Sequence, residues 1–245
     1  MESEKRAAEA ASYLDEFSGS GLDSITNEAV ATAYLGMVQP GSAPTQEGAE
    51  PGTWINSATR ENYGNNVSVI PVAFKTIWSE RMSEAPFTTV ARYEPNSIEV
   101  EVVPVKPGKR GYPKMVNPVS GNEIKELFVY AVILPEHPEA EVLILSPTAS
   151  SMRACKSWNS QLRSQLLPNG KPAPIFAFTW NLGLELVQNP NQPANKMARI
   201  AGVQKGSLVD ENLFTNNVKP QLSSVQRTIL SITADADSDT EESNS

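Results

Sequence analysis

The sequence predicts a β-rich α+β protein, built as a small β-barrel or a strongly bent antiparallel sheet with one internal and one C-terminal helix. Two observations predict this class. Runs of β-branched and apolar residues recur between 67 and 203, as is typical of antiparallel strands. Apolar side chains at helical spacing follow residue 150 and again residue 209.

The first half of this region is predicted to be strand. Residues 67–74 form a β-branched run in which Pro71 indicates a sheet edge or a bulge. Residues 97–105 alternate as a half-buried strand does. The apolar runs 126–134 and 141–146 flank a proline-containing turn and predict a hairpin.

The second half is predicted to begin with the internal helix. Ser150 or Ser151 is a suitable cap for it, because a serine hydroxyl accepts a hydrogen bond from the first helical turn. Strands are expected at about 174–188 and 196–203. A final amphipathic helix is expected around 209–231.

Charge and composition divide the chain into four parts. We expect an acidic helical extension over 1–38, a linker rich in proline and glycine over 39–53, a β-rich body over 54–232 and a disordered acidic tail over 233–245. The net charge is −8, yet residues 62–234 hold 17 bases against 13 acids. A mildly basic body therefore lies between two acidic ends.

Most enzyme classes are excluded by composition. A single cysteine, Cys155, and a single histidine, His137, exclude a disulfide framework and Cys/His zinc sites. Phosphate-loop, dinucleotide and nucleophile-elbow patterns are missing. No stretch approaches the roughly 20 apolar residues of a membrane span, and the N-terminus has no apolar signal core. We expect a cytoplasmic, non-enzymatic protein with no cofactor, no bound metal and no membrane partner.

Basic residues in the body stand beside aromatic ones, which is typical of single-strand binding, where cations follow phosphates and rings stack on bases. The alternative for each tryptophan is a place in the core. The candidate phosphate contacts are Lys75, Arg81, Arg92, Lys109, Arg110, Lys114, Arg153, Lys156 and Arg163. The candidate stacking platforms are Trp78, Tyr93, Tyr112 and Trp158.

The acidic tail has two interpretations. It is a solubilising terminus, or it is a polyanion that competes with nucleic acid for the basic body and recruits partner proteins. Its acidic residues are Asp235, Asp237, Asp239, Glu241 and Glu242.

Three segments, 51–57, 63–74 and 150–159, resemble a family of tailed-bacteriophage early-region proteins. Such proteins are often taken to be phage single-stranded DNA-binding proteins. The resemblance implies an oligonucleotide-binding (OB) barrel, a role in DNA replication or recombination in the host cytoplasm, and no cofactor. The acidic C-terminus is also similar to those of such proteins, but it ends in Ser243-Asn244-Ser245 where they commonly end in an aromatic residue.

The leading hypothesis is a phage protein that binds single-stranded DNA through a basic, aromatic-lined groove with little sequence preference. The alternative is a virion or scaffold-type interaction protein that forms a homo-oligomer through its acidic N-terminal helices. A third hypothesis is a metal-dependent nuclease that uses only carboxylates, such as Glu99 and Glu101. These two lie on one strand face, where solvated surface is the simpler interpretation.

Overall fold

The structure is a computed structural model and describes residues 33–82, 88–105, 113–137, 140–189, 192–222 and 225. The expected helices before residue 33 and the expected disordered tail lie outside these residues. No helix in the described part of the chain combines the length and the hydropathy that crossing a membrane requires.

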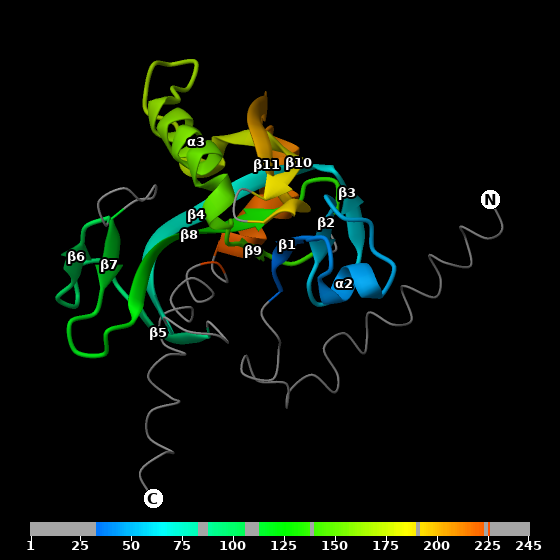
Figure 1. The fold of residues 1–245 in the computed structure, drawn as a ribbon. Coiled ribbons are helices and arrows are strands. Elements are labelled where there is room, and N and C mark those ends of the chain that lie inside the picture. The colour runs from blue at the N-terminus through cyan, green and yellow to red at the C-terminus, as the bar shows by residue number, and fades with distance from the viewer. Residues whose placement is uncertain are drawn as a thin grey trace, which may run out of the picture. The chain divides into compact units, whose positions relative to one another are not determined.

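Within the described residues, the elements follow one another as a series of strands with one full-length helix (Figure 1). The strands are β1 Leu35–Met37, β2 Trp54–Asn56, β3 Asn62–Gly64, β4 Asn66–Arg81, β5 Thr89–Tyr93, β6 Glu101–Val103, β7 Lys114–Val116, β8 Glu123–Ile133, β9 Leu143–Leu145, β10 Phe178–Asn189 and β11 Gln192–Leu208. The helices and helical turns are α2 Ala43–Gln46, η2 Ala149–Ser151, α3 Met152–Ser164, η3 Ile175–Ala177, α4 Glu211–Leu213 and η4 Phe214–Val218.

Eight strands form one antiparallel sheet in the order β11-β10-β4-β8-β7-β6, with β5 paired to β4 and β9 paired to β8. The terminal strands of this order, β11 and β6, are not paired with each other, so no barrel closes within the described residues. The β-rich α+β class is confirmed. The hairpin of β8 and β9 is also confirmed, with Tyr130 opposite Leu145.

The centre of the sheet is buried on both faces. Along β8, Phe128, Tyr130 and Val132 enter one hydrophobic core, whereas the alternate residues Val129 and Ala131 enter a second core. Residues from α3 complete the first core, and residues from η4 and the chain that follows complete the second. Because side chains alternate between the faces of a strand, a strand covered on both sides is apolar throughout.

Pro71 lies where β4 tolerates the loss of a backbone donor. A bulge falls between Pro71 and Ala73 in the pairing with β8. On the other side of β4, β10 pairs only with residues 66–69 and β5 only with residues 78–81. Proline cannot donate to a sheet and is confined to such places, so the expectation of an edge or bulge is confirmed.

The helical extension and linker predicted before residue 54 need correction. Residues 35–37 form β1, which pairs with β2 in a separate three-stranded sheet β1-β2-β3. Gln39, in the expected linker, exchanges two hydrogen bonds with the backbone of Ala198 on β11, at 2.8 and 2.9 Å. This segment is therefore attached to the body, because strand pairing and a bidentate amide contact outweigh its local helical spacing.

Other predicted bounds also shift. The strand expected at 97–105 shortens to β6, while β5 and β7 were not expected, since each has few residues of clear alternation. The strand expected at 196–203 lengthens to β11. Helix α3 ends at Ser164, because Gln165 is already extended. The hydroxyl of Ser151 does not cap α3; it accepts a hydrogen bond from the backbone N–H of Ile200, at 3.0 Å.

Candidate nucleic-acid interface

The structure divides the predicted contact residues into two groups. The first group, the strand group, comes from β4, β5 and β7, and cross-strand pairing places Trp78 opposite Tyr93 and Ser79 opposite Arg92. The second group lies on α3, which packs against β11 at the other end of the sheet order (Figure 1). The strand group is Lys75, Trp78, Arg81, Arg92, Tyr93 and Lys114.

Carboxylates neutralise much of the strand group. The ammonium of Lys75 lies 2.5 Å from a carboxylate oxygen of Glu94. Lys114 and the neighbouring Lys125 both approach Glu123, at 3.6 and 3.7 Å. Glu94 directly follows β5 and Glu123 begins β8, so strand pairing brings Glu94 beside Lys75 and Glu123 beside Lys114, whereas Lys125 lies two residues from Glu123 on the same strand. The strand group is consequently not a strongly cationic surface.

Glu80 is the buried centre of this end of the sheet, with 2% of its surface exposed. One carboxylate oxygen accepts hydrogen bonds from Tyr93 (2.7 Å) and Asn117 (2.9 Å), and the other from Ser120 (2.5 Å) and Asn122 (2.7 Å). Burial by itself raises the pKa of Glu80, but the four hydrogen bonds together outweigh burial and hold that pKa below 4.5. A charged Glu80 therefore joins β4 to β5 and to the turn between β7 and β8.

Tyr93 is already committed to this network. Burial and the adjacent Glu80 carboxylate raise the pKa of Tyr93 to about 12. Its hydroxyl is therefore a permanent donor to Glu80 at neutral pH, and its ring is half-buried.

The predicted stacking role of Trp158 is wrong for this conformation. Trp158 is fully buried and stacks on Tyr130, with ring centroids 4.6 Å apart, and it meets Trp180 edge to face at 6.2 Å. Trp78 is 8% exposed, and Trp54 is fully buried. Helix α3 carries Trp158 on the side that faces the sheet, so the large apolar ring is used for packing.

Several predicted residues lie outside the described part of the chain. They are Lys109, Arg110 and Tyr112 of the basic loop, and the tail residues Asp235, Asp237, Asp239, Glu241 and Glu242. The loop connects β6 to β7, which pair as a hairpin.

The second group belongs to a basic segment of the chain that continues onto β11 and that residue spacing did not reveal. Between 147 and 209 the chain holds seven bases and one acid, Glu185, whereas the rest of residues 62–234 holds 10 bases and 12 acids. A windowed charge count would have found this segment. We call these bases the α3–β11 surface; they are Arg153, Lys156, Arg163, Lys171, Lys196, Arg199 and Lys205.

Most of these bases are open to solvent. Arg153, Lys156 and Arg163 are exposed on α3, as are Lys171, Lys196 and Lys205 beyond it. Lys205 donates to the side-chain oxygen of Gln165 at 2.5 Å, and its ammonium stands 3.6 Å from the centre of the Phe178 ring. Arg199 pairs with Glu185 through two nitrogens, each at 2.8 Å from one carboxylate oxygen.

A polar cleft of about 470 Å³ opens between α3 and β11. We call it the α3–β11 cleft. Its helix side consists of Ser150, Arg153, Ala154, Ser157 and Gln161, and its strand side consists of Glu185, Arg199, Ile200, Ala201, Gly202 and Val203.

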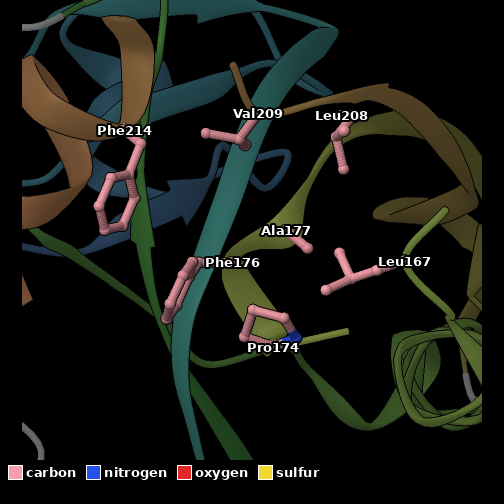
Figure 2. A pocket seen from close by; sticks show the side chains of 7 residues that line it. All are labelled: Leu167, Pro174, Phe176, Ala177, Leu208, Val209 and Phe214. Atoms are coloured by element: carbon pink, nitrogen blue, oxygen red, sulfur yellow. The ribbon is translucent and has the colours of Figure 1, made fainter. Parts of the chain in front are cut away.

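A second pocket, of about 210 Å³, is apolar (Figure 2). Phe176 and Phe214 stack beside it with ring centroids 5.8 Å apart. Its other lining residues are Leu167, Pro174, Ala177, Leu208 and Val209. With no charged or hydrogen-bonding side chain in its lining, this pocket has no group to recognise a phosphate.

Among the described residues, no three His, Cys, Asp or Glu side chains lie close enough together to hold a metal ion.

A family model described as "Pam3 phage gp34-like protein" matches residues 2–228 of the chain. No curated protein matches the chain, and no solved structure matches it.

Proposed function

We propose that this chain, which belongs to the Pam3 phage gp34-like protein family, binds single-stranded DNA without being an enzyme. The observation that carries the proposal is the α3–β11 surface, because its segment of the chain, residues 147–209, holds seven bases and one acid. Non-specific affinity for nucleic acid comes mainly from cations that release counterions from phosphates. A role in phage DNA replication or recombination is the corresponding biological proposal.

The proposed interface differs from an aromatic-lined OB groove. The indoles of Trp54, Trp78, Trp158 and Trp180 are buried, so affinity is assigned to charge more than to stacked tryptophan rings. The strand group, with its bases paired to Glu94 and Glu123, contributes less. The tail beyond Thr233, with five acids and no base, would compete with DNA for the α3–β11 surface.

The test is a fluorescence-anisotropy titration of labelled oligo-dT at several salt concentrations. The variant Lys156→Gln/Arg163→Gln removes two charges from α3. The matched control Lys114→Gln/Lys125→Gln removes one charge from the strand group and one from its neighbour Lys125. We expect the α3 variant to lower the log–log salt slope by about 1.4, which is about 0.7 for each phosphate contact. We expect the control to leave the slope unchanged.

Removal of the residues after Thr233 should tighten binding at low salt and have little effect at high salt, where screening weakens the tail. An affinity that does not depend on salt, or equal losses in both double variants, would refute the assignment to the α3–β11 surface.

A second candidate, a phage structural or scaffold-type interaction protein, is favoured by one observation. Four valines are exposed on or beside β5, β6 and β7: Val90, Val102, Val103 and Val119, of which Val119 is 94% exposed. Exposed apolar side chains are available to bind a partner protein. Sedimentation velocity distinguishes the two candidate functions. Self-assembly that is unchanged by added oligonucleotide would support the structural or scaffold-type protein.

A further inference from the structure

The α3–β11 cleft contains one positive charge that the described residues do not neutralise. Arg153 lies at its helix side, and no described residue forms a hydrogen bond or an ion pair with it. The other two charges in the lining, Arg199 and Glu185, cancel each other as a pair. A ligand that enters the cleft therefore meets a net charge of +1, which favours a monoanion such as a phosphodiester.

The cleft is also large enough for more than a phosphate. Its volume of about 470 Å³ lies in the range of about 300–1,000 Å³ that small-molecule sites occupy. Short side chains and a glycine keep it open: Ala154 and Ser157 from α3, and Ala201 and Gly202 from β11. Gln161 adds an amide that both donates and accepts hydrogen bonds.

Arg199 supplies a flat group in place of an aromatic ring. Its Nε donates a hydrogen bond to a Glu185 oxygen, and its Nη2 lies 2.8 Å from the same oxygen, so the guanidinium is held at two points. Unstacked bases in single strands pack on guanidinium planes as well as on aromatic rings. With the four indoles buried, Arg199 is the guanidinium in the cleft lining that an ion pair holds in place.

We propose that the α3–β11 cleft binds one nucleotide of the single strand. Arg153 contacts the phosphodiester, the guanidinium of Arg199 stacks on the base, and Gln161 hydrogen-bonds to the base edge. This proposal rests on the proposed single-strand binding and adds a base-dependent contribution to an interface that is otherwise electrostatic.

The decisive variant is Gly202→Val, because it fills the cleft without changing charge. A Cβ added at Gly202 meets no atom within 4 Å, so the fold has room for the new side chain. A second filling variant, Ser157→Leu, acts from the exposed helix side. The control is Asn181→Val, at an exposed position of β10 that does not line the cleft.

Full-length protein is titrated with labelled oligo-dT and with an abasic oligonucleotide of the same length. We expect wild type and Asn181→Val to prefer oligo-dT by roughly tenfold, as one stacked base would supply. We expect both filling variants to lose this preference while the salt slope stays unchanged. Arg153→Ala should instead reduce the slope on both oligonucleotides.

If wild type binds oligo-dT but both filling variants keep its preference over the abasic strand, the cleft proposal is wrong and the proposed function stands. If wild type binds neither oligonucleotide, the proposed function itself is wrong. Far-UV circular dichroism of every variant confirms that the fold is retained.

Discussion

Replacing Glu80 by glutamine keeps the shape of the side chain but turns one of its two acceptor oxygens into a donor. Each oxygen of the wild-type carboxylate accepts two hydrogen bonds. Whichever way the new amide turns, its NH₂ group faces one hydroxyl and one asparagine NH₂. The hydroxyl of Tyr93 or Ser120 can rotate and accept, whereas the NH₂ of Asn117 or Asn122 cannot.

The size of the effect follows from these contacts. A hydrogen bond to a charged group contributes about 1.5–3 kcal/mol, and an unsatisfied buried donor costs about 1–3 kcal/mol. If Asn117 turned over, it would lose the bond that its side-chain oxygen accepts from the N–H of Val119 at 3.0 Å. We therefore expect Glu80→Gln to lower the free energy of unfolding by about 3 kcal/mol and Tm by about 6–12 °C.

The assay is urea denaturation followed by far-UV circular dichroism at pH 7, with Glu126→Gln as the control. Glu126 is exposed on β8, so we expect its substitution to change the free energy of unfolding by less than about 0.5 kcal/mol. If Glu80→Gln lowers the free energy of unfolding no more than Glu126→Gln does, the four hydrogen bonds to Glu80 do not have the proposed stabilising role.

The pH dependence gives a second check. The pKa of Glu80 in the folded protein is held below its ordinary value of 4.5. A lowered folded pKa stabilises the fold fully above the unfolded pKa, and this stabilisation is lost as the pH falls through the folded pKa. The difference in the free energy of unfolding between wild type and Glu80→Gln should be constant from pH 7 to about pH 5. It should become smaller below pH 4.5. A difference in the free energy of unfolding that stays constant below pH 4.5 would contradict a lowered pKa of Glu80.

Three further predictions concern α3 and β11. Burial raises the pKa of the Cys155 thiol to about 12. We therefore expect Cys155 not to react with a thiol reagent at pH 8 in the native protein and to react rapidly in urea. Rapid labelling of the native protein would contradict the burial of Cys155. Trp158→Ala should lower the free energy of unfolding by about 3–5 kcal/mol, measured by urea denaturation, because Trp158 is fully buried against Tyr130; exposed Lys156→Ala is its control. Gly206→Ala should destabilise the pairing of β10 with β11, because the new Cβ would lie 2.3 Å from the hydroxyl oxygen of Thr179. The measurement is thermal unfolding. An unchanged Tm would contradict the close approach of Gly206 to Thr179.

The spacing of apolar residues predicted the elements that are long enough to show a clear strand or helix pattern. The apolar run of β8 and the helical spacing of Met152, Cys155 and Leu162 on α3 were sufficient to place both elements. The shorter strands β5 and β7, with five and three residues, were missed, since a few residues carry too little periodicity to identify a strand.

Sequence alone established the α+β class, the hairpin of β8 and β9 and the basic middle between acidic ends, because periodicity and charge are properties of neighbouring residues. Tertiary structure alone decided that Trp158 is packed inside, that Lys75 meets Glu94, and that Arg153 and Arg199 share one cleft. Strand register and helix docking make these contacts between distant positions, and they depend on which surfaces the whole chain can bury together.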